Sequence, residues 1–134
     1  MLLRSVVSVT GVASNVSTEG VVATLPPVPL PNDPSGLLVQ ATVIDGFLNF
    51  TAGAGTTAVV VRVRRGSLAG AQVGPNLTHT LAAAAIGSVA VAVNDTPLQA
   101  TPPNEGQVYV VTIQQTGGTG AGSTNYAVFT ATMS

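Results

Sequence analysis

The stretch Thr57-Ala-Val-Val-Val-Arg-Val-Arg-Arg65 carries the clearest structural signal in the chain. Every second residue from Val59 to Val63 is valine, and Arg62 and Arg64 alternate with these valines. Successive side chains of a β-strand point to opposite faces. The pattern therefore predicts a strand with one valine face toward the core and with the two arginines on the other face.

Similar apolar runs lie on both sides of this stretch. Valine, threonine and isoleucine dominate them, and glycine or proline interrupts them at short intervals. About eight such strands with turn residues between them predict an all-β fold, an antiparallel sandwich. The alanine-rich segment Leu81–Ile86 is too short to nucleate a helix alone and predicts one turn at most. The other predicted strands and apolar runs are Leu3–Val12, Gly20–Leu25, Leu37–Ile44, Phe47–Phe50, Leu77–Leu81, Val89–Val93, Val108–Gln115 and Asn125–Met133.

The dipeptide Asp45-Gly46 separates two of these runs. Asp-Gly favours a type I′ turn, which needs positive φ at both central residues. It predicts a hairpin turn at this point, with Leu37, Val39, Ala41 and Val43 on one face of the preceding strand and Gln40 and Thr42 on the other.

The segment 26–34 holds five of the nine prolines. Proline cannot donate a hydrogen bond to a central β-ladder, so this segment predicts an extended surface strap. The expected organisation is an N-terminal strand or strands with a proline-rich arm over residues 1–35, followed by the sandwich over residues 36–134.

The composition excludes several kinds of chemistry. The 134 residues include no cysteine and no lysine, which removes disulfides, thiolate sites, P-loop phosphate clamps and Schiff bases. One histidine cannot build a multi-histidine metal site. Four arginines and a net charge of −1 do not predict a nucleic-acid binder. No apolar run approaches the length of a membrane helix, and polar residues break the apolar start, so no cleaved signal peptide is expected.

Charged residues make up only 7% of the chain, against roughly 25% in an ordinary domain. Either hydroxyl and amide groups hydrate the surface, or partners cover much of it.

Residues 36 to 133 contain a particular order of motifs. An apolar strand is followed by Asp-Gly, Phe-Leu-Asn-Phe-Thr-Ala-Gly-Ala-Gly-Thr-Thr, Val-Val-Val-Arg-Val-Arg-Arg-Gly, Leu-Ala-Gly-Ala-Gln-Val-Gly, Gly-Gln-Val-Tyr-Val-Val-Thr-Ile-Gln-Gln-Thr and Asn-Tyr-Ala-Val-Phe-Thr-Ala-Thr. In strand order and turn placement this part resembles the small jelly rolls of the tumour-necrosis-factor/C1q type found among bacteriophage virion proteins. The resemblance implies a jelly-roll sandwich and a homotrimer whose protomers meet through apolar and aromatic faces. It also implies that the N-terminal arm reaches a neighbouring subunit or the capsid floor.

The only charge cluster is Arg62, Arg64 and Arg65. Arginine suits interface ion pairs, so the cluster is a candidate contact with acidic groups of a capsid shell or another protomer. The competing interpretation is that the arginines only cover the solvent face of their strand, where ion pairs contribute little.

Aromatic residues and prolines supply the other candidate contacts. All five aromatic residues lie in predicted strands, which favours packing in the core or at a trimer contact over stacking on sugars. We expect Tyr126 and Phe129 near the subunit contact, and Pro26, Pro27 and Pro29 within the arm as further interface residues.

No catalytic, cofactor or metal site is predicted. His79 lies on one side of its strand with two leucines, as a partly buried histidine or as a pH sensor on a symmetry axis. The chain lacks a Gly-x-Ser-x-Gly elbow. The four acids that loops might offer to calcium, Asp33, Asp45, Asp95 and Glu105, do not match a calcium-loop spacing.

The function expected from these observations is that of a non-enzymatic virion structural protein. It would be a trimeric capsid decoration (cement) or minor capsid protein on the capsid surface, with copies of itself and the major capsid protein or another virion component as partners, and without nucleic acid, membrane or cofactor. A receptor- or glycan-binding trimeric head of a spike or fibre is the alternative. A bacterial surface or carbohydrate-binding module is a third possibility.

Overall fold

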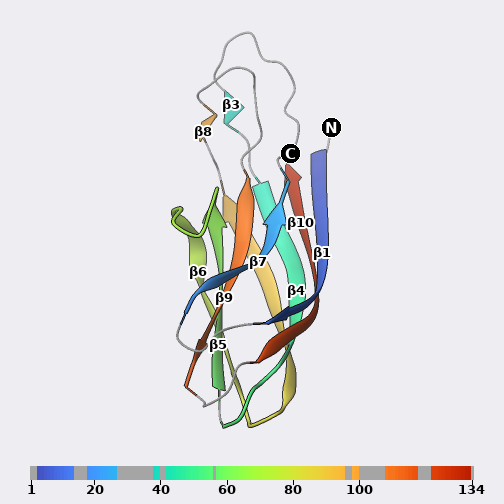
Figure 1. The fold of residues 1–134 in the computed structure, drawn as a ribbon. Helices are drawn as coiled ribbons and strands as arrows, with labels where there is room; N and C mark the ends of the chain where they lie inside the picture. Colours follow the sequence, from blue (N-terminus) through green and yellow to red (C-terminus); the bar gives the residue numbers. More distant parts are fainter. Residues whose placement is uncertain are drawn as a thin grey trace.

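The computed structural model describes residues 3–13, 18–26, 38–39, 42–55, 57–95, 98–99, 108–117 and 122–133. Every regular element among these residues is a β-strand, as the sequence predicts (Figure 1). The strands are β1 (Leu3–Ala13), β2 (Gly20–Leu25), β3 (Leu38–Val39), β4 (Thr42–Thr51), β5 (Thr57–Arg65), β6 (Gln72–Leu81), β7 (Ile86–Asp95), β8 (Leu98–Gln99), β9 (Tyr109–Thr116) and β10 (Ser123–Met133).

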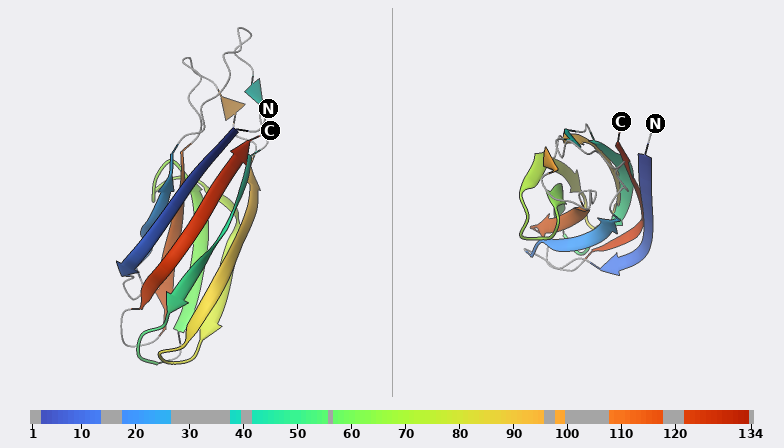
Figure 2. Two further views of the ribbon diagram at one scale, coloured as in Figure 1. Left: turned by 90° about the vertical axis from the view of Figure 1, so that its right-hand side faces the viewer. Right: turned by 90° about the horizontal axis from the view of Figure 1, so that it is seen from above.

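Two four-stranded sheets form a sandwich. Sheet A has the order β1-β10-β4-β7, and sheet B has the order β2-β9-β5-β6. Figure 2 shows the strands of sheet A side by side and, from above, the two sheets wrapped around a common interior. The short strands β3 and β8 form a separate two-stranded sheet that lies beyond one end of the sandwich (Figure 1).

The strand pairing identifies the sandwich as a jelly roll. β1 pairs with β10, β2 with β9, β3 with β8, β4 with β7 and β5 with β6, all antiparallel. The chain is thus one long hairpin, in which each strand of the first half pairs with its counterpart in the second half. Two lateral pairings, β10 with β4 and β9 with β5, roll this hairpin into two layers.

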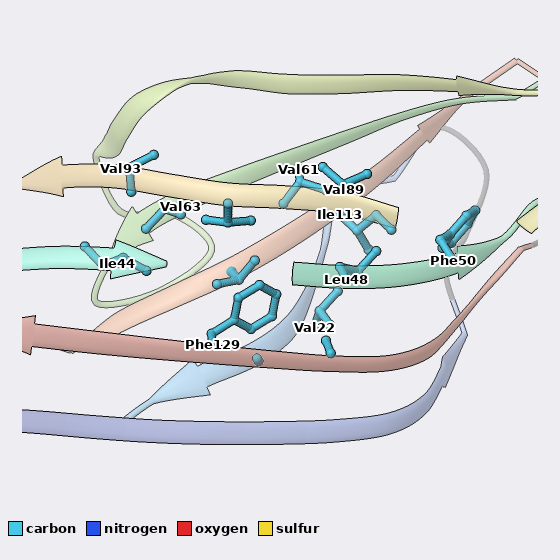
Figure 3. Packing of buried hydrophobic residues seen from close by; sticks show 14 of the residues in the cluster. Val22, Ile44, Leu48, Phe50, Val61, Val63, Val89, Val93, Ile113 and Phe129 are labelled. Atoms are coloured by element: carbon cyan, nitrogen blue, oxygen red, sulfur yellow. The ribbon is translucent and has the colours of Figure 1, made fainter. Parts of the chain in front are cut away.

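The core lies between the sheets and follows the period of two. Val59, Val61 and Val63 of β5 are at most 1% exposed, which confirms the predicted buried face. They pack with the inward side chains of both sheets, several of which Figure 3 shows. Arg62 and Arg64 lie on the outer surface of sheet B, as the same alternation predicts.

The predicted turn at Asp45-Gly46 is wrong. Both residues lie inside β4, which pairs with β10 and β7 along its length. Thr42 and Ile44 are buried whereas Val43 is 42% exposed, so Val43 of the predicted apolar face points outward and the opposite side of the strand faces the core.

Gly46 explains why a turn-like dipeptide lies within a strand. Its φ is +149°, and it is registered opposite Phe129 of β10. A Cβ atom at this position would lie 2.0 Å from the carbonyl oxygen of Val128 and 2.9 Å from Cδ1 of Phe129. The glycine therefore permits close approach of β10 and its Phe129 ring, and does not reverse the chain.

The N-terminal strands belong to the sandwich. β1 is registered with β10 through ten residue pairs, and β2 pairs with β9. The sequence predicts residues 1–35 as a segment before a sandwich that begins at residue 36. The strands β1 and β2 of this segment are instead part of the two sheets, because their backbones pair with β10 and β9. Pro26 is exposed at the end of β2, whereas residues 27–37 lie outside the described residues.

β6 is longer than predicted because it tolerates proline. It is the outer strand of sheet B and contains Gly74, with a φ of +74°, followed by Pro75. An edge strand can accept a residue without an N–H group. The alanine-rich segment after β6 forms a non-helical turn, in which Ala84 N–H donates to the Gly53 carbonyl at 3.0 Å.

We expect Gly46→Ala to lower the free energy of unfolding by at least about 3 kcal/mol, because the new methyl group meets backbone atoms and the φ is unfavourable. Gly66→Ala is the matched control: Gly66 also has a positive φ, +79°, but nothing lies within 4 Å of a Cβ there. It should lose only about 1 kcal/mol. Urea unfolding of both variants tests this, and equal losses would contradict the packing role of Gly46.

Candidate functional site

The outer surface of sheet A carries a group of exposed apolar side chains. They are between 37% and 55% exposed although valine, phenylalanine and tyrosine usually avoid water. Strand alternation directs them away from the core while their neighbours fill it. We call this group the apolar face, and it consists of Val6 of β1, Val43 and Phe47 of β4, and Tyr126 and Val128 of β10.

The strand register places the central members of the apolar face next to one another. Phe47 is registered opposite Val128 on one side and opposite Ala90 of β7 on the other. The rings of Phe47 and Tyr126 form an edge-to-face pair, with centroids 5.7 Å apart and an interplanar angle of 82°. This geometry is favourable for aromatic rings, and it fixes two large side chains in the middle of an exposed sheet.

Uncharged polar groups border the aromatic pair. The side-chain amide of Asn125 donates to Oδ1 of Asn49 at 2.9 Å and to Oγ1 of Thr51 at 2.7 Å. The amide of Asn49 donates to Oγ of Ser88 at 3.2 Å. The apolar face thus has a polar, neutral border toward the end of sheet A opposite β3 and β8.

The structure separates the two aromatic residues that the sequence placed together at a subunit contact. Tyr126 is 46% exposed on the apolar face, but Phe129 is 0% exposed in the core (Figure 3). Side chains three residues apart on a strand point to opposite faces of the sheet. The expectation for Phe129 is therefore corrected: its side chain supports the sandwich from inside and offers no surface to a partner.

Val43, Phe47 and Val128 were not predicted as surface residues. For Val43 and Phe47 the signal was their alternation with Asp45 along one strand, which places all three side chains on the same side. The incorrect turn predicted at Asp45-Gly46 divided this strand in two, so the shared side was not recognised.

Arg62 and Arg64 form a polar network on the outer surface of sheet B. Arg64 makes a two-point ion pair with Glu19, with Nε and Nη2 donating to the carboxylate at 2.8 and 3.0 Å. Thr112 donates to the same carboxylate at 2.6 Å. Arg62 donates to Gln114 at 2.8 Å and to Asn76 at 3.0 Å. These guanidinium groups thus have partners within the chain.

Glu19 directly precedes β2, and its contacts with Arg64 and Thr112 hold this end of β2 on sheet B. The hydrogen bond from Arg64 is the main cause that lowers the pKa of Glu19, with burial acting in the opposite direction. The same bond raises the pKa of Arg64. The carboxylate is therefore held in its charged form at neutral pH.

Arg65 takes part in a different interaction, which connects the two sheets. Its Nε donates to Oδ2 of Asp95 at 2.8 Å, and its Nη2 contacts Oδ1. The hydroxyl of Tyr109 donates to the same carboxylate at 2.7 Å. Asp95 ends β7 in sheet A, whereas Arg65 and Tyr109 belong to sheet B. Burial, followed by the bond to Asp95, raises the pKa of Tyr109 above its usual range.

The remaining candidate residues do not form a common site in the part of the chain that the structure describes. His79 is exposed on β6 and lies close to Gly87 of β7. A Cβ atom added at Gly87 would be 3.0 Å from Nε2 of the histidine ring. No group of three metal-ligating side chains occurs among the described residues. Pro27, Pro29, Asp33 and Glu105 lie outside them. No helix in the described ranges is long and apolar enough to span a membrane.

Comparisons with known proteins identify the fold. No model of a known protein family matches the chain, and no curated protein matches its sequence. Similar solved structures include the T13 particle of infectious bursal disease virus, with a TM-score of 0.55, 10% identity, and coverage of 97% of this chain and 34% of that chain. The Gx strain of that virus gives a TM-score of 0.53 and 11% identity, covering 97% of this chain and 36% of the other.

A tumour necrosis factor, Eiger from S. frugiperda, has a TM-score of 0.44 and 8% identity, with coverage of 98% of this chain and 90% of that chain. This chain spans about a third of the length of the viral chains that it matches. At these identities the viral likeness shows the fold alone. It confirms the jelly-roll part of the resemblance, whereas a bacteriophage origin stays a prediction.

We expect the ion pair of Glu19 to make the free energy of unfolding depend on pH in the acidic range. Because the pKa of Glu19 is lowered in the folded state, its stabilisation is present above the ordinary glutamate value of about 4.3 and disappears as the pH falls through the folded value. Glu19→Gln should be about 1 kcal/mol less stable than wild type at pH 7, and this difference should shrink as the pH falls below about 4.3. Urea unfolding at a series of pH values from 7 downward measures the difference, and a difference that does not shrink in acid would contradict the assignment.

Proposed function

We propose that this protein is a non-enzymatic structural component of a virion, a homotrimeric capsid decoration or minor capsid protein on the capsid surface. Its jelly roll, which it shares with chains of a viral particle, supports this role. So does the scarcity of charge, because a chain with only 7% charged residues has little to keep its copies apart in solution. The protein would act mechanically, by adding contacts between subunits of the shell.

The apolar face is the observation that carries the proposal. Contiguous exposed apolar side chains with a polar border mark interaction surfaces, and large aromatic residues near the centre of a contact contribute most of its binding energy. Covering this face removes apolar area from water at about 25 cal/mol per Å². A second copy of the chain is the partner that is always present at the same concentration.

A ring of three copies suits a contact of this kind. A patch that meets a different surface on the next copy gives a heterologous contact, which forms a closed ring when the rotation closes. In such a ring the apolar face is covered, whereas the polar outer surface of sheet B stays available for the shell. Arg62 and Arg64 remain candidates for contacts with acidic groups there, and Arg65 remains one at the end of β5, in competition with their partners within the chain.

The proline-rich segment is the second proposed contact. It leaves β2 at the exposed Pro26, and Pro27 and Pro29 would extend it toward the shell or a neighbouring protomer. Removal of residues 1–35 would delete β1 and β2 from the sheets. A Pro27→Ser, Pro29→Ser double variant tests the arm without that damage.

A glycan-binding head of a spike or fibre is the second candidate function. The aromatic pair of Phe47 and Tyr126 beside the amides of Asn49 and Asn125 favours it, because exposed rings stack on sugars and neutral amides bind their hydroxyl groups. In that case the same surface would bind a glycan, and copies would not cover it.

We expect Tyr126→Ala to weaken self-association at least tenfold, because a central aromatic side chain of the contact is removed. Thr80→Ala is the matched control, since Thr80 is exposed on β6 at the edge of sheet B, and it should leave association unchanged. Native mass spectrometry over a dilution series measures both. A monomeric wild type, or a Tyr126→Ala variant with wild-type association, would contradict the proposed contact.

Binding to the shell separates the two candidate functions. The recombinant protein should be retained by empty capsids of the virus that encodes it, and the Pro27→Ser, Pro29→Ser variant should be retained less. Binding to host cells or to an array of neutral glycans, without retention by capsids, would reject the decoration role and support the glycan-binding head.

A further inference from the structure

Asp45 lies within the apolar face, between Val43 and Phe47 of β4. It is exposed, and it is the only charged residue among the described side chains on the outer surface of sheet A. It forms no ion pair with any residue that the structure describes. Sheet B differs in this respect, since its outer-surface arginines pair with Glu19.

Among the side chains that the structure describes, none next to Asp45 carries a positive charge. It is registered opposite Thr130 of β10 and opposite Ala92 of β7. Its neighbours on the same side of β4 are apolar. The nearest basic residue by register is Arg4 of β1, which pairs with Thr132 at the next outward position of β10. The side chain of Arg4 is not among those described.

Self-association through the apolar face has a consequence for this carboxylate. A contact that covers both Val43 and Phe47 also covers the residue between them. An unpaired carboxylate in an apolar contact is costly, and such a group takes up a proton to become neutral. We propose that copies of this chain associate with uptake of one proton at each buried Asp45, so that the assembly strengthens as the pH falls from neutral toward 4.

This inference rests on the proposed self-contact and adds a regulator to it. Each proton taken up on association changes the association constant by up to about tenfold per pH unit. For three copies the effect multiplies, so a modest acidification would drive a dilute monomer into the assembled form. An asparagine at this position would keep the shape of aspartate without the charge, and would remove the dependence.

The test is a sedimentation-velocity titration of wild type and Asp45→Asn between pH 7.5 and 4. We expect wild-type association to rise steeply on acidification. Asp45→Asn should associate at least tenfold more tightly than wild type at pH 7.5 and should change little with pH. Asp45 is exposed, so the variant should fold; circular dichroism at each pH checks this. Glu19→Gln is the control, with a carboxylate removed from the other sheet, and it should retain the wild-type pH profile of association.

Two results would overturn the inference while leaving the self-contact intact. One is an Asp45→Asn variant that oligomerises with the same pH dependence as wild type. The other is a wild type that dissociates in acid, together with an Arg4→Gln variant that is already weakened at pH 7.5, because Arg4 of a neighbouring copy would then neutralise Asp45. If neither protein self-associates at any pH, the proposed contact itself fails, and the inference fails with it.

Discussion

The antiparallel pairing of the first half of the chain with the second half is the constraint on which the rest of the structure depends. β1 against β10 and β2 against β9 join segments more than 80 residues apart, and β4 and β5 then connect these pairs laterally into two sheets. Once a strand has a neighbour on each side, its register decides which side chains enter the core. A shift by one residue would exchange the buried and exposed sets throughout the strand.

The two outer surfaces of the sandwich have different chemistry for this reason. On sheet B, Arg62 and Arg64 share the outward side of β5 with Val60, and Glu19, Gln114 and Asn76 accept their hydrogen bonds within the chain. On sheet A, the outward positions include the valines and aromatic rings of the apolar face, with the carboxylate of Asp45 among them. The arginines described on the outer surface of sheet B thus have partners within the chain, whereas the side chains of the apolar face on sheet A are exposed.

Local patterns predicted a large part of the fold. Alternation predicted β5 over its full length, and β2 also has its predicted bounds, because β-branched residues with a period of two have few other stable arrangements. The prediction of strand bounds failed at glycine and proline, because both residue types are typical of turns but also occur inside strands under particular conditions. Glycine after aspartate is typical of a turn, but Gly46 lies inside β4 with a φ of +149°, and glycine is needed there for the approach of Phe129 from a strand far along the chain. Pro75 in β6 is tolerated because this strand lies at the edge of sheet B as described and its register with β5 shifts at this point, and no local pattern reveals either condition.

The sequence by itself determined the all-β class, most strand positions, and the absence of cysteine and lysine chemistry. It also placed Tyr126 among the candidate contact residues. Only the tertiary structure decided that Tyr126 is exposed whereas Phe129 is buried, and that Phe47 stands beside Tyr126. Only the structure could show that Arg65 reaches Asp95 across the two sheets. The physical reason is that periodicity specifies which residues share a face of a strand, but long-range pairing specifies which face meets the core and which strands become neighbours.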